Sequence, residues 1–395
     1  MTVYLDHAAT TPMLPAAIAA YAEAMTVVGN PASIHSQGQN AKRMLEEARE
    51  HVAASVGCDP IEVVFTAGGT EAINLGIKGL YWARAPRTRI LVPGGEHHAT
   101  LDTVEWLAAQ EGAHVEWIPL DTLGRIDLTA LEQAIASNPS DVALVTLLMA
   151  NNEVGTVQPI AEVAALAAAH GIPVHVDAVS AYGHLPIDFA ALAAAGVSAL
   201  SISAHKIGGP VGIGALILSR RATVVPLIHG GGQQRQVRSG TQDVAAAVSF
   251  AVAAVAATKD LLGEQLRLAA LRERLVAGVL ASIPGAVSNG DPQPAGRIAG
   301  NAHFTFAGCE GDSLLFLLDA AGVSVSTGSA CQAGIPEPSH VLRAMGRSEI
   351  EARGALRITL GRTSTDTDVD AFLAALPAAH AQASRAGLAD RTPTF

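Results

Sequence analysis

Seven short apolar runs, separated by helix-like segments, constrain the fold of this 395-residue chain more than any other feature. Most of the runs are nearly continuous and rich in β-branched residues and leucine, as are strands that are buried on both faces. The segments between them, such as residues 159–170 (PIAEVAALAAAH) before Gly171, are typical of helices that end at a glycine. This alternation predicts an α/β fold around a seven-stranded, mostly parallel sheet. The runs are residues 62–66, 89–93, 114–120, 141–149, 172–178, 197–203 and 214–219.

The pattern changes after Gly240. Residues 243–280 read as one long helical stretch, and the loop at 288–301 (SNGDPQPAGRIAGN) follows it. Short strand-like segments then flank a further helix, which predicts a smaller α+β unit. We therefore expect a large α/β domain over residues 15–257 and a small α+β domain formed by residues 1–14 and 258–395.

Composition excludes several classes of protein. Lys and Arg number 25 and Asp and Glu 36, and the resulting net charge of −11 argues against direct nucleic-acid binding. The longest apolar helix-like run, residues 244–257, is shorter than the roughly 20 residues that span a bilayer, and no secretory signal is recognisable. Three cysteines without a CxxC pair predict neither a disulfide framework nor a metal site. We expect a cytoplasmic enzyme with no membrane partner.

Residues with reactive or ligand-binding side chains directly follow several of the apolar runs. In parallel α/β sheets, ligands bind beyond the carboxyl ends of the strands. Gly69 and Thr70 open a helix whose free N–H groups suit a phosphate, although an ordinary β–α turn has the same sequence. Asp177 ends a strongly apolar strand and needs a partner, either a cationic ring nitrogen or a structural Arg or Lys. Lys206 follows another buried strand, where desolvation favours the free amine that forms a Schiff base.

Two further strand ends carry His97 and Asn152. Each taken alone has a plain interpretation, a surface histidine or an amide that caps a turn. Their combination with a phosphate site, a carboxylate and a lysine is informative, because pyridoxal 5′-phosphate (PLP) needs such a set. The sequence therefore predicts a PLP site at this edge of the sheet.

The segment STGSAC, residues 326–331, places Cys331 among small and glycine residues. Such a composition predicts a mobile, open loop with an accessible thiol. Cys58 and Cys309 lie in turn-like contexts without such a loop, and we expect both to be structural.

The motifs, in their order and spacing, resemble those of the NifS/IscS-type cysteine desulfurases, PLP-dependent enzymes of aminotransferase fold type I (class V). The similarity extends over nearly the whole chain. The motifs that carry it are YLDHAATTP, GNPASIH, TAGGTEAIN, EHHATLD, NNEVGTVQPI, VHVDA, SISAHKIGGPVGIGAL, HGGGQQRQVRSGT, STGSAC, EPSHVLRAMG and RITLGRTST.

The resemblance implies a role for each site residue. Lys206 would hold PLP covalently, Asp177 would pair with its pyridine nitrogen, and His97 would stack on the ring and shuttle protons. Arg357 and Asn152 would hold the substrate carboxylate, Asn152 also contacting the cofactor. The residues expected at the phosphate are Gly69, Thr70, Ser203 and His205, with Thr241 reaching the phosphate of the neighbouring subunit in a homodimer.

The implied reaction converts L-cysteine to L-alanine and leaves the sulfur on Cys331 as a persulfide. A sulfur-acceptor protein, such as an iron–sulfur scaffold or a tRNA-thiolation enzyme, would receive it. One position departs from the family: Ser180 stands where a glutamine usually contacts the phenolic oxygen of the cofactor. A serine hydroxyl reaches less far, and water can bridge the gap, so we expect a shifted pKa of the lysine–PLP linkage or slower turnover.

Two alternatives remain open at this point. The chain could be another PLP enzyme of this fold, such as an aminotransferase or a selenocysteine lyase. It could also be a non-catalytic sulfur-relay or scaffold subunit. The set of Lys206, Asp177, His97, Cys331 and Arg357 argues against the last of these.

Overall fold

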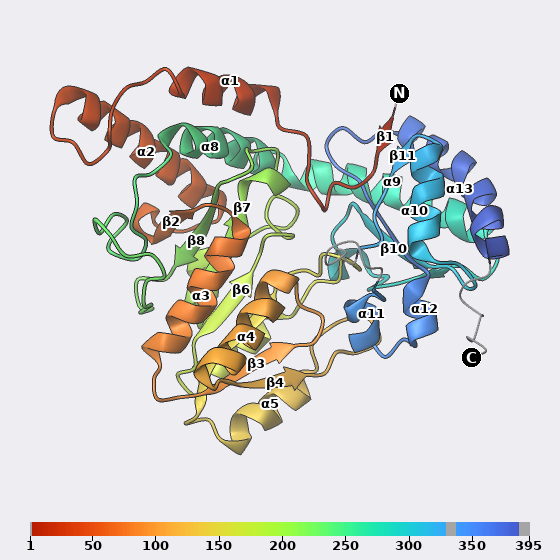
Figure 1. Ribbon diagram of the computed structural model, residues 1–395, viewed down its shortest axis with the longest axis horizontal. Helices are drawn as coiled ribbons and strands as arrows, with labels where there is room; N and C mark the ends of the chain where they lie inside the picture. Colours follow the sequence, from red (N-terminus) through yellow and green to blue (C-terminus); the bar gives the residue numbers. More distant parts are fainter. Residues whose placement is uncertain (1, 329–336, 387–395) are drawn as a thin grey trace.

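The computed structural model describes residues 2–328 and 337–386 and has a seven-stranded sheet at its centre (Figure 1). The strand order is β2-β8-β7-β6-β5-β3-β4. The α/β class and the seven-stranded, mostly parallel sheet expected from the sequence are confirmed. The strands are β2 (Val63–Thr66), β3 (Arg89–Pro93), β4 (His114–Ile118), β5 (Val142–Leu148), β6 (Val174–Asp177), β7 (Val197–Ser203) and β8 (Gly214–Leu218).

The direction of the strands places their carboxyl ends at one edge of the sheet. Strands β3, β4, β5, β6 and β7 pair in parallel, and β8 is antiparallel to both of its neighbours, β7 and β2. Strand β2 therefore runs in the same direction as the parallel strands, and its carboxyl end lies at the same edge. One expectation needs correction: β4 is an edge strand that is only partly buried, and Trp117 on it is 46% exposed.

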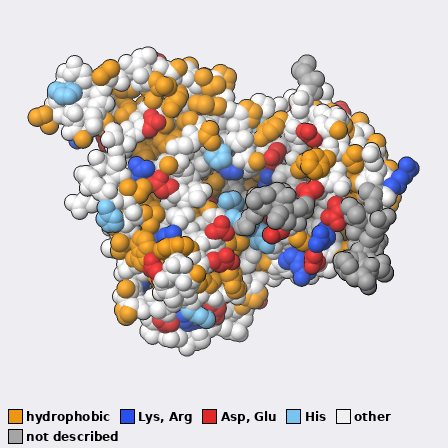
Figure 2. Space-filling model, viewed as in Figure 1, with side chains coloured by type: hydrophobic (Ala, Val, Ile, Leu, Met, Phe, Trp, Pro, Cys, Tyr) orange, Lys and Arg blue, Asp and Glu red, His pale blue; other side chains and the backbone are white. Residues whose placement is uncertain are grey.

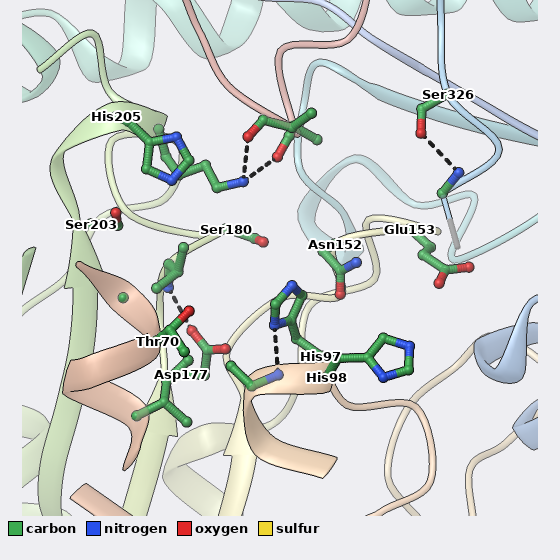
Figure 3. Close-up of a pocket in the computed structure, with 18 of the residues that line it drawn as sticks. Thr70, His97, His98, Asn152, Glu153, Asp177, Ser180, Ser203, His205 and Ser326 are labelled. Atoms are coloured by element: carbon green, nitrogen blue, oxygen red, sulfur yellow. Dashed lines mark hydrogen bonds between the residues drawn. The ribbon is translucent and has the colours of Figure 1, made fainter. Parts of the chain in front are cut away.

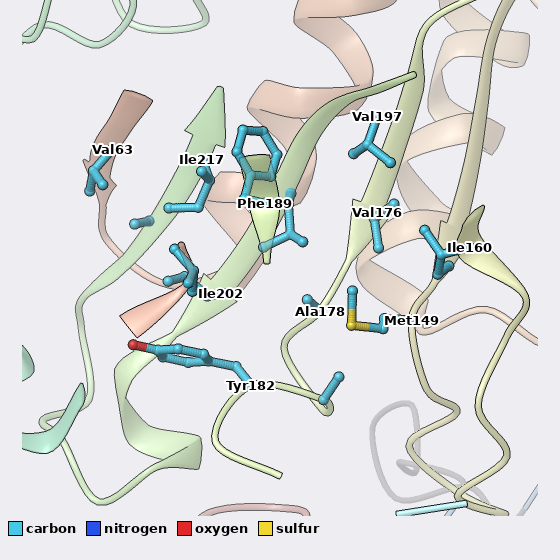
Figure 4. Packing of buried hydrophobic residues seen from close by; sticks show 14 of the residues in the cluster. Val63, Met149, Ile160, Val176, Ala178, Tyr182, Phe189, Val197, Ile202 and Ile217 are labelled. Carbon is cyan, nitrogen blue, oxygen red and sulfur yellow. The ribbon is translucent and has the colours of Figure 1, made fainter. Parts of the chain in front are cut away.

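Helices cover both faces of the sheet, and the main core lies between them and the strands (Figure 4). Helix α3 packs against β7 and β8 and beside α4, while α6 and α7 pack on β6 and β7 from the other face. Phe189 and Tyr182 are fully buried in this core. The helices are α1 (Pro15–Ala24), α2 (Ser36–Ser55), α3 (Gly69–Ala83), α4 (His98–Glu111), α5 (Leu128–Ser137), α6 (Ile160–Ala168), α7 (Phe189–Ala195) and α8 (Val244–Thr258).

A second, smaller unit has its own apolar core, formed by Leu5 and by residues between Leu268 and Ala383. Its three-stranded antiparallel sheet has the order β12-β10-β9, and β1 pairs in parallel with β11. The pairing of β1 joins Val3 and Tyr4 to this unit, whereas Met13 and Leu14 pack against the core of the large one, and the boundary at residue 14 stays a prediction. Its elements are β1 (Val3–Tyr4), α9 (Leu261–Ser282), β9 (Val287–Ser288), β10 (Asn301–Thr305), α10 (Gly311–Ala320), β11 (Val323–Ser324), α11 (His340–Ala344), α12 (Glu349–Arg353), β12 (Ala355–Thr359) and α13 (Asp366–Ala386).

The long helical stretch expected over residues 243–280 is two helices, α8 and α9. The break lies at Lys259 and Asp260, and the Asp260 side chain accepts a hydrogen bond from the Gly263 backbone N–H, which caps the start of α9. Within the described residues, no single helix is long and apolar enough to cross a membrane. Helices α8 and α9 reach the length and apolar composition of a membrane span only when taken together, and they are bent by 70° at their junction.

Candidate active site

A cavity of about 350 Å³ opens at the carboxyl edge of the large sheet. Its volume lies within the range of ordinary ligand sites. Figure 2 shows histidines and charged side chains gathered around a hollow between the two units. The cavity brings together ten residues that the sequence singled out, namely Gly69, Thr70, His97, Asn152, Asp177, Ser180, Ser203, His205, Lys206 and Arg357.

Asp177 ends β6 near the middle of the sheet edge, paired across the ladder with Leu148 of β5 and Ser201 of β7. Its carboxylate is buried, and Oδ1 accepts a hydrogen bond from the Val179 backbone N–H at 2.9 Å. Burial raises the pKa of Asp177 to about 6, although this hydrogen bond and the nearby Lys206 lower it. A cationic group bound in the cavity would stabilise the carboxylate in its charged form.

Lys206 follows β7 in a short 3₁₀ turn, Ala204–Lys206, and its amine lies inside the molecule. The Nζ group donates to the backbone oxygens of Ala8 and Ala9, at 2.5 and 2.8 Å. Burial, and then the positive charge of Arg357, lower the pKa of Lys206 to about 8. The free amine, which nucleophilic attack on an aldehyde requires, is therefore far more populated near neutral pH than in an ordinary lysine, although the ammonium form still predominates.

His97 is the N-cap residue of α4, where its Nδ1 accepts a hydrogen bond from the Ala99 backbone N–H at 3.0 Å. Burial, followed by the charge of Lys206, lowers the pKa of His97 to about 4. The ring is therefore neutral. Because Nδ1 accepts a bond, the ring proton is on Nε2. The local fold thus fixes both the position and the tautomer of this imidazole (Figure 3).

The N-terminus of α3 forms another wall of the cavity. The N–H groups of its first turn have no acceptor within the helix, and the helix dipole adds partial positive charge there. Gly69 is needed because a Cβ atom at this position would lie 2.7 Å from the Val179 side chain and 3.4 Å from Ser203. Ser203 and His205 line the cavity beside it, so donors from two elements surround one space. This is the arrangement expected for an anion site.

Arg357 comes from β12 of the smaller unit and faces the sheet edge. Its Nη1 donates to the Asn152 backbone oxygen and its Nη2 to Asp6 Oδ1, each at 2.9 Å. Among the described residues, Arg357 Nε and Asn152 Oδ1 are buried and have no hydrogen-bond partner. Buried polar atoms are rarely left unpaired. These two atoms therefore each need a polar partner, which a bound ligand or an ordered water can supply.

Two of the expected residues are not among those that line this cavity. Thr241 is exposed and does not line the cavity, and Cys331 lies outside the described residues. Cys58 and Cys309 are free thiols whose pKa values are raised by burial, that of Cys58 to about 12. Neither thiol is therefore a nucleophile at neutral pH, which agrees with a structural role.

The sequence interpretation assigned no role to several residues that line or support the cavity. Ala8 and Ala9, from the N-terminal motif YLDHAATTP, line the cavity. Asp6, from the same motif, orients Arg357. Glu96 lies behind the cavity: its Oε1 accepts from the Leu148 backbone N–H, and burial raises its pKa well above the ordinary value. The negative charge of Asp177 also raises the pKa of Glu96, which places the two carboxyl groups close together behind the cavity.

Three polar residues on the side of the smaller unit were also missed. His98 and His340 stack edge to face with ring centroids 5.1 Å apart, and the buried Glu153 accepts a hydrogen bond from Ser339 at 2.5 Å. All three line the cavity with Ser326 and Gly328, from segments that meet only in the folded chain. The signals for this cluster in the sequence are the adjacency of His98 to His97 and of Glu153 to Asn152.

A lysine, an aspartate and a histidine at the carboxyl ends of parallel strands, facing a helix N-terminus, define the class of PLP-dependent enzymes of fold type I.

The comparisons with known proteins agree with this class. The family model for class-V aminotransferases matches residues 3–372. An IscS-like cysteine desulfurase of Mycobacterium tuberculosis is 55% identical over 98% of both chains, and a cysteine desulfurase IscS of Methanosarcina thermophila is 40% identical over 95% of this chain and 91% of its own. The X-ray structure of a NifS-like protein from Rickettsia africae superposes with a TM-score of 0.86 at 31% identity, covering 96% of this chain and all of the other.

The chain therefore belongs to the class-V aminotransferase family and, within it, to the NifS/IscS-type cysteine desulfurases.

Proposed function

We propose that the cavity binds PLP, with Lys206 as its covalent anchor. The buried Asp177 carboxylate matches the pyridine nitrogen, and the first turn of α3, with Ser203 and His205, matches the phosphate. Gly69 lets the first turn of α3 pack closely against Val179 and Ser203, which keeps its N–H groups at this wall of the cavity. The residues present fit the group on each of these three counts.

We propose that the protein converts L-cysteine to L-alanine and passes the sulfur to Cys331. The observation that carries this proposal is the convergence of Lys206, Asp177, His97 and Arg357 on one cavity. Bound PLP takes up the electron pair that remains when the α C–H bond of the substrate breaks. Asp177 would hold the pyridine nitrogen in its protonated form. Lys206 Nζ, unprotonated above a pKa of about 8, accepts the α-proton.

Arg357 fixes the orientation of the substrate. Its guanidinium is held by Asn152 and Asp6, and its Nε, which has no partner among the described residues, still has a hydrogen bond to donate to a substrate carboxylate. His97, a neutral imidazole with its proton on Nε2, can donate to or exchange protons with the reacting groups. The cavity walls thus hold both ends of the amino acid.

The transfer of sulfur balances as a displacement. The Cys331 thiolate attacks the substrate sulfur and forms an S–S bond, and the Cβ–S bond breaks. Its electron pair stays with Cβ, which takes up a proton and becomes the methyl group of alanine. The persulfide on Cys331 then goes to an acceptor protein, such as an iron–sulfur scaffold or a tRNA-thiolation enzyme. We propose that this takes place in the cytoplasm.

We propose that the protein acts as a homodimer. Helices α1, α2 and α8 border a groove lined by Ala24, Met44, Val248 and Val255, and Figure 2 shows hydrophobic side chains over the region where Figure 1 places α1 and α8. Nearby, Met25 is 66% exposed and Val28 is 82% exposed. Apolar surface of this kind favours association with another chain. Thr241, exposed in a single chain, is then available to a neighbouring site.

Mass spectrometry of Cys331 after incubation with L-cysteine tests this function. We expect a mass increase of one sulfur atom on Cys331 and release of alanine, and the Cys331→Ala variant should lose sulfide production by about 10²-fold or more, as removal of a nucleophile does. Cys58→Ala is the matched control and should keep full activity. Full sulfide release by Cys331→Ala would contradict the persulfide mechanism and favour a selenocysteine lyase or an aminotransferase. A protein that binds no PLP would instead be a relay or scaffold subunit.

A further inference from the structure

Lys206 lines not one cavity but three. Besides the active-site cavity, it borders a cavity of about 30 Å³ and another of about 100 Å³. His7 and His184 line both of these smaller cavities. The two cavities therefore adjoin each other at Lys206 and at two imidazoles, and we refer to them together as the rear passage.

The 30 Å³ cavity is suited to hold water. A buried water needs roughly 10–15 Å³ and two to four polar partners. Two residues that line this cavity, Asn152 and Asn301, each have a buried side-chain oxygen without a hydrogen-bond partner among the described residues. Ser180 lines it as well and adds a hydroxyl group. An ordered water here would satisfy the unpaired oxygens.

The 100 Å³ cavity leads from the same residues to the surface. Its lining includes Pro12, Pro15 and Arg362, which are exposed, and it lies where the N-terminal segment meets the smaller unit. His7 is held by Thr11, with Nδ1 and Oγ1 2.6 Å apart, and is only 4% exposed. His184 is partly buried and follows the turn after Tyr182.

The two histidines are in the form that can relay protons. Burial lowers the pKa of His7, and burial together with the charge of His7 lowers the pKa of His184 to about 4. A neutral imidazole has one donor and one acceptor nitrogen, so it can take a proton on one side and release one on the other. Lys206 and Arg362 also lower the pKa of His184, while Glu264 raises it. All of these groups line the 100 Å³ cavity.

We propose that this rear passage is a proton path between Lys206 and bulk water, with a water in the 30 Å³ cavity and His184 as its relay and His7 beside them. The inference rests on the proposed role of Lys206 as the group that takes the α-proton. Of the residues that line the 100 Å³ cavity, Lys206 alone also lines the active-site cavity, so ligands bound in the active-site cavity would leave the 100 Å³ cavity open to solvent. His184 acts through Lys206 and does not touch the substrate.

The proton balance is simple. The α C–H bond breaks, its electron pair stays on the substrate side, and the proton joins Lys206 Nζ to form an ammonium group. The ammonium gives a proton to the cavity water, which passes one to an imidazole nitrogen of His184. The imidazolium then releases a proton to solvent at the mouth of the passage. Lys206 returns to the free amine, and no redox partner is needed.

Exchange of the α-proton of L-alanine in D₂O, followed by NMR on the PLP-loaded protein, tests the relay. We expect the His184→Leu variant to exchange more slowly by about tenfold to a hundredfold, the low end of what proton-transfer groups contribute. Breaking of the α C–H bond, measured separately with α-deuterated alanine in single-turnover experiments, should be unchanged. The control is His380→Gln, which alters a partly buried histidine on α13 and should exchange like the wild type.

Two further measurements exclude a simple folding defect. Imidazole added to a His184→Ala variant should restore exchange, because the passage opens to the surface. A high-resolution crystal structure should show an ordered water within hydrogen-bond distance of Asn152 and Asn301. Wild-type exchange by His184→Leu, or a dry 30 Å³ cavity, would overturn the relay and leave the proposed function standing. Absence of any exchange in a PLP-loaded wild type would overturn both.

Discussion

The two walls of the active-site cavity are built in different ways. The wall formed by the large sheet takes its groups from strand ends: Asp177 closes β6, Lys206 follows β7, and His97 follows β3. The opposite wall takes its groups from segments far apart in the chain. Arg357 on this wall is held by Asp6, 351 residues away in the chain. The Ala8 carbonyl, also on this wall, accepts a hydrogen bond from Lys206, 198 residues away.

This difference teaches which part of a site is a property of the fold and which depends on how distant segments meet. Strand ends in a buried parallel sheet are held by the hydrogen-bond ladder, so the groups on them are preorganised. The far wall depends on the packing of the N-terminal segment and the smaller unit against that edge. We expect the sheet wall to govern the chemistry and the far wall to govern binding and orientation.

Loss of the lysine should have the largest effect. Lys206→Ala removes both the anchor of PLP and the base, and we expect turnover to fall by at least about 10³-fold, within the range for a positioned acid–base group. Steady-state assay of alanine formation, together with the absorbance of the bound cofactor, measures it. Lys78→Ala, which removes a lysine stacked on Trp106 outside the cavity, is the control. Retained turnover in Lys206→Ala would show that the sheet wall does not supply the chemistry.

Replacement of the arginine on the far wall should act mainly on binding. Arg357→Lys keeps the charge but loses the planar fork, and hydrogen bonds to charged groups contribute about 1.5–3 kcal/mol each, so KM should rise roughly 10- to 100-fold with a smaller change in kcat. Arg272→Lys replaces a buried arginine of α9, away from the cavity, and serves as the control. A loss confined to kcat would mean that the two walls do not divide the work as proposed.

The pH dependence of PLP capture by the apoprotein sharpens the electrostatic side of the comparison. Below a pKa of about 8, Lys206 is an ammonium group and cannot attack the aldehyde; above it, the free amine can. The capture rate should therefore rise with pH through about 8 and then level off, whereas an ordinary lysine would continue to gain until about 10.4. In Arg357→Gln, which removes a positive charge that lowers this pKa, the midpoint should move to higher pH. A wild-type midpoint near 10 would contradict the burial argument.

A substitution at Ser180 should have the smallest effect. Ser180 lines both the active-site cavity and the 30 Å³ cavity behind it, and a glutamine would fill that space and replace a water-mediated contact with a direct one. Such an exchange is worth about 0–2 kcal/mol, so Ser180→Gln should shift the pKa of the lysine–PLP linkage or change turnover by less than roughly 30-fold. An absorbance titration and a turnover assay detect either change. Identical values in the variant and the wild type would refute the role given to Ser180.

Much of the fold could be predicted because the apolar runs are buried and short-range patterns specify them. The seven strands and the mostly parallel sheet follow from that pattern. The sequence pattern predicts one helix where the structure has α8 and α9, because the break at Asp260 depends on one side-chain cap. Most of the sheet wall of the site could also be predicted, since reactive residues directly follow strands. Glu96 was not assigned a role, because its importance comes from its burial behind Asp177 and not from its neighbours in the sequence.

The sequence by itself determined the sheet, the family, and the residues at the strand ends, because these depend on local periodicity and on motifs that are continuous in the chain. Only the tertiary structure decided that the carbonyls of Ala8 and Ala9 hold the Lys206 amine, that Asp6 orients Arg357, and that two smaller cavities adjoin the lysine from behind. The physical reason is the same in each case. Burial and contacts between distant segments set the pKa values and decide which buried polar atoms lack a partner and where water can bind. Burial and these contacts arise only when the chain has packed.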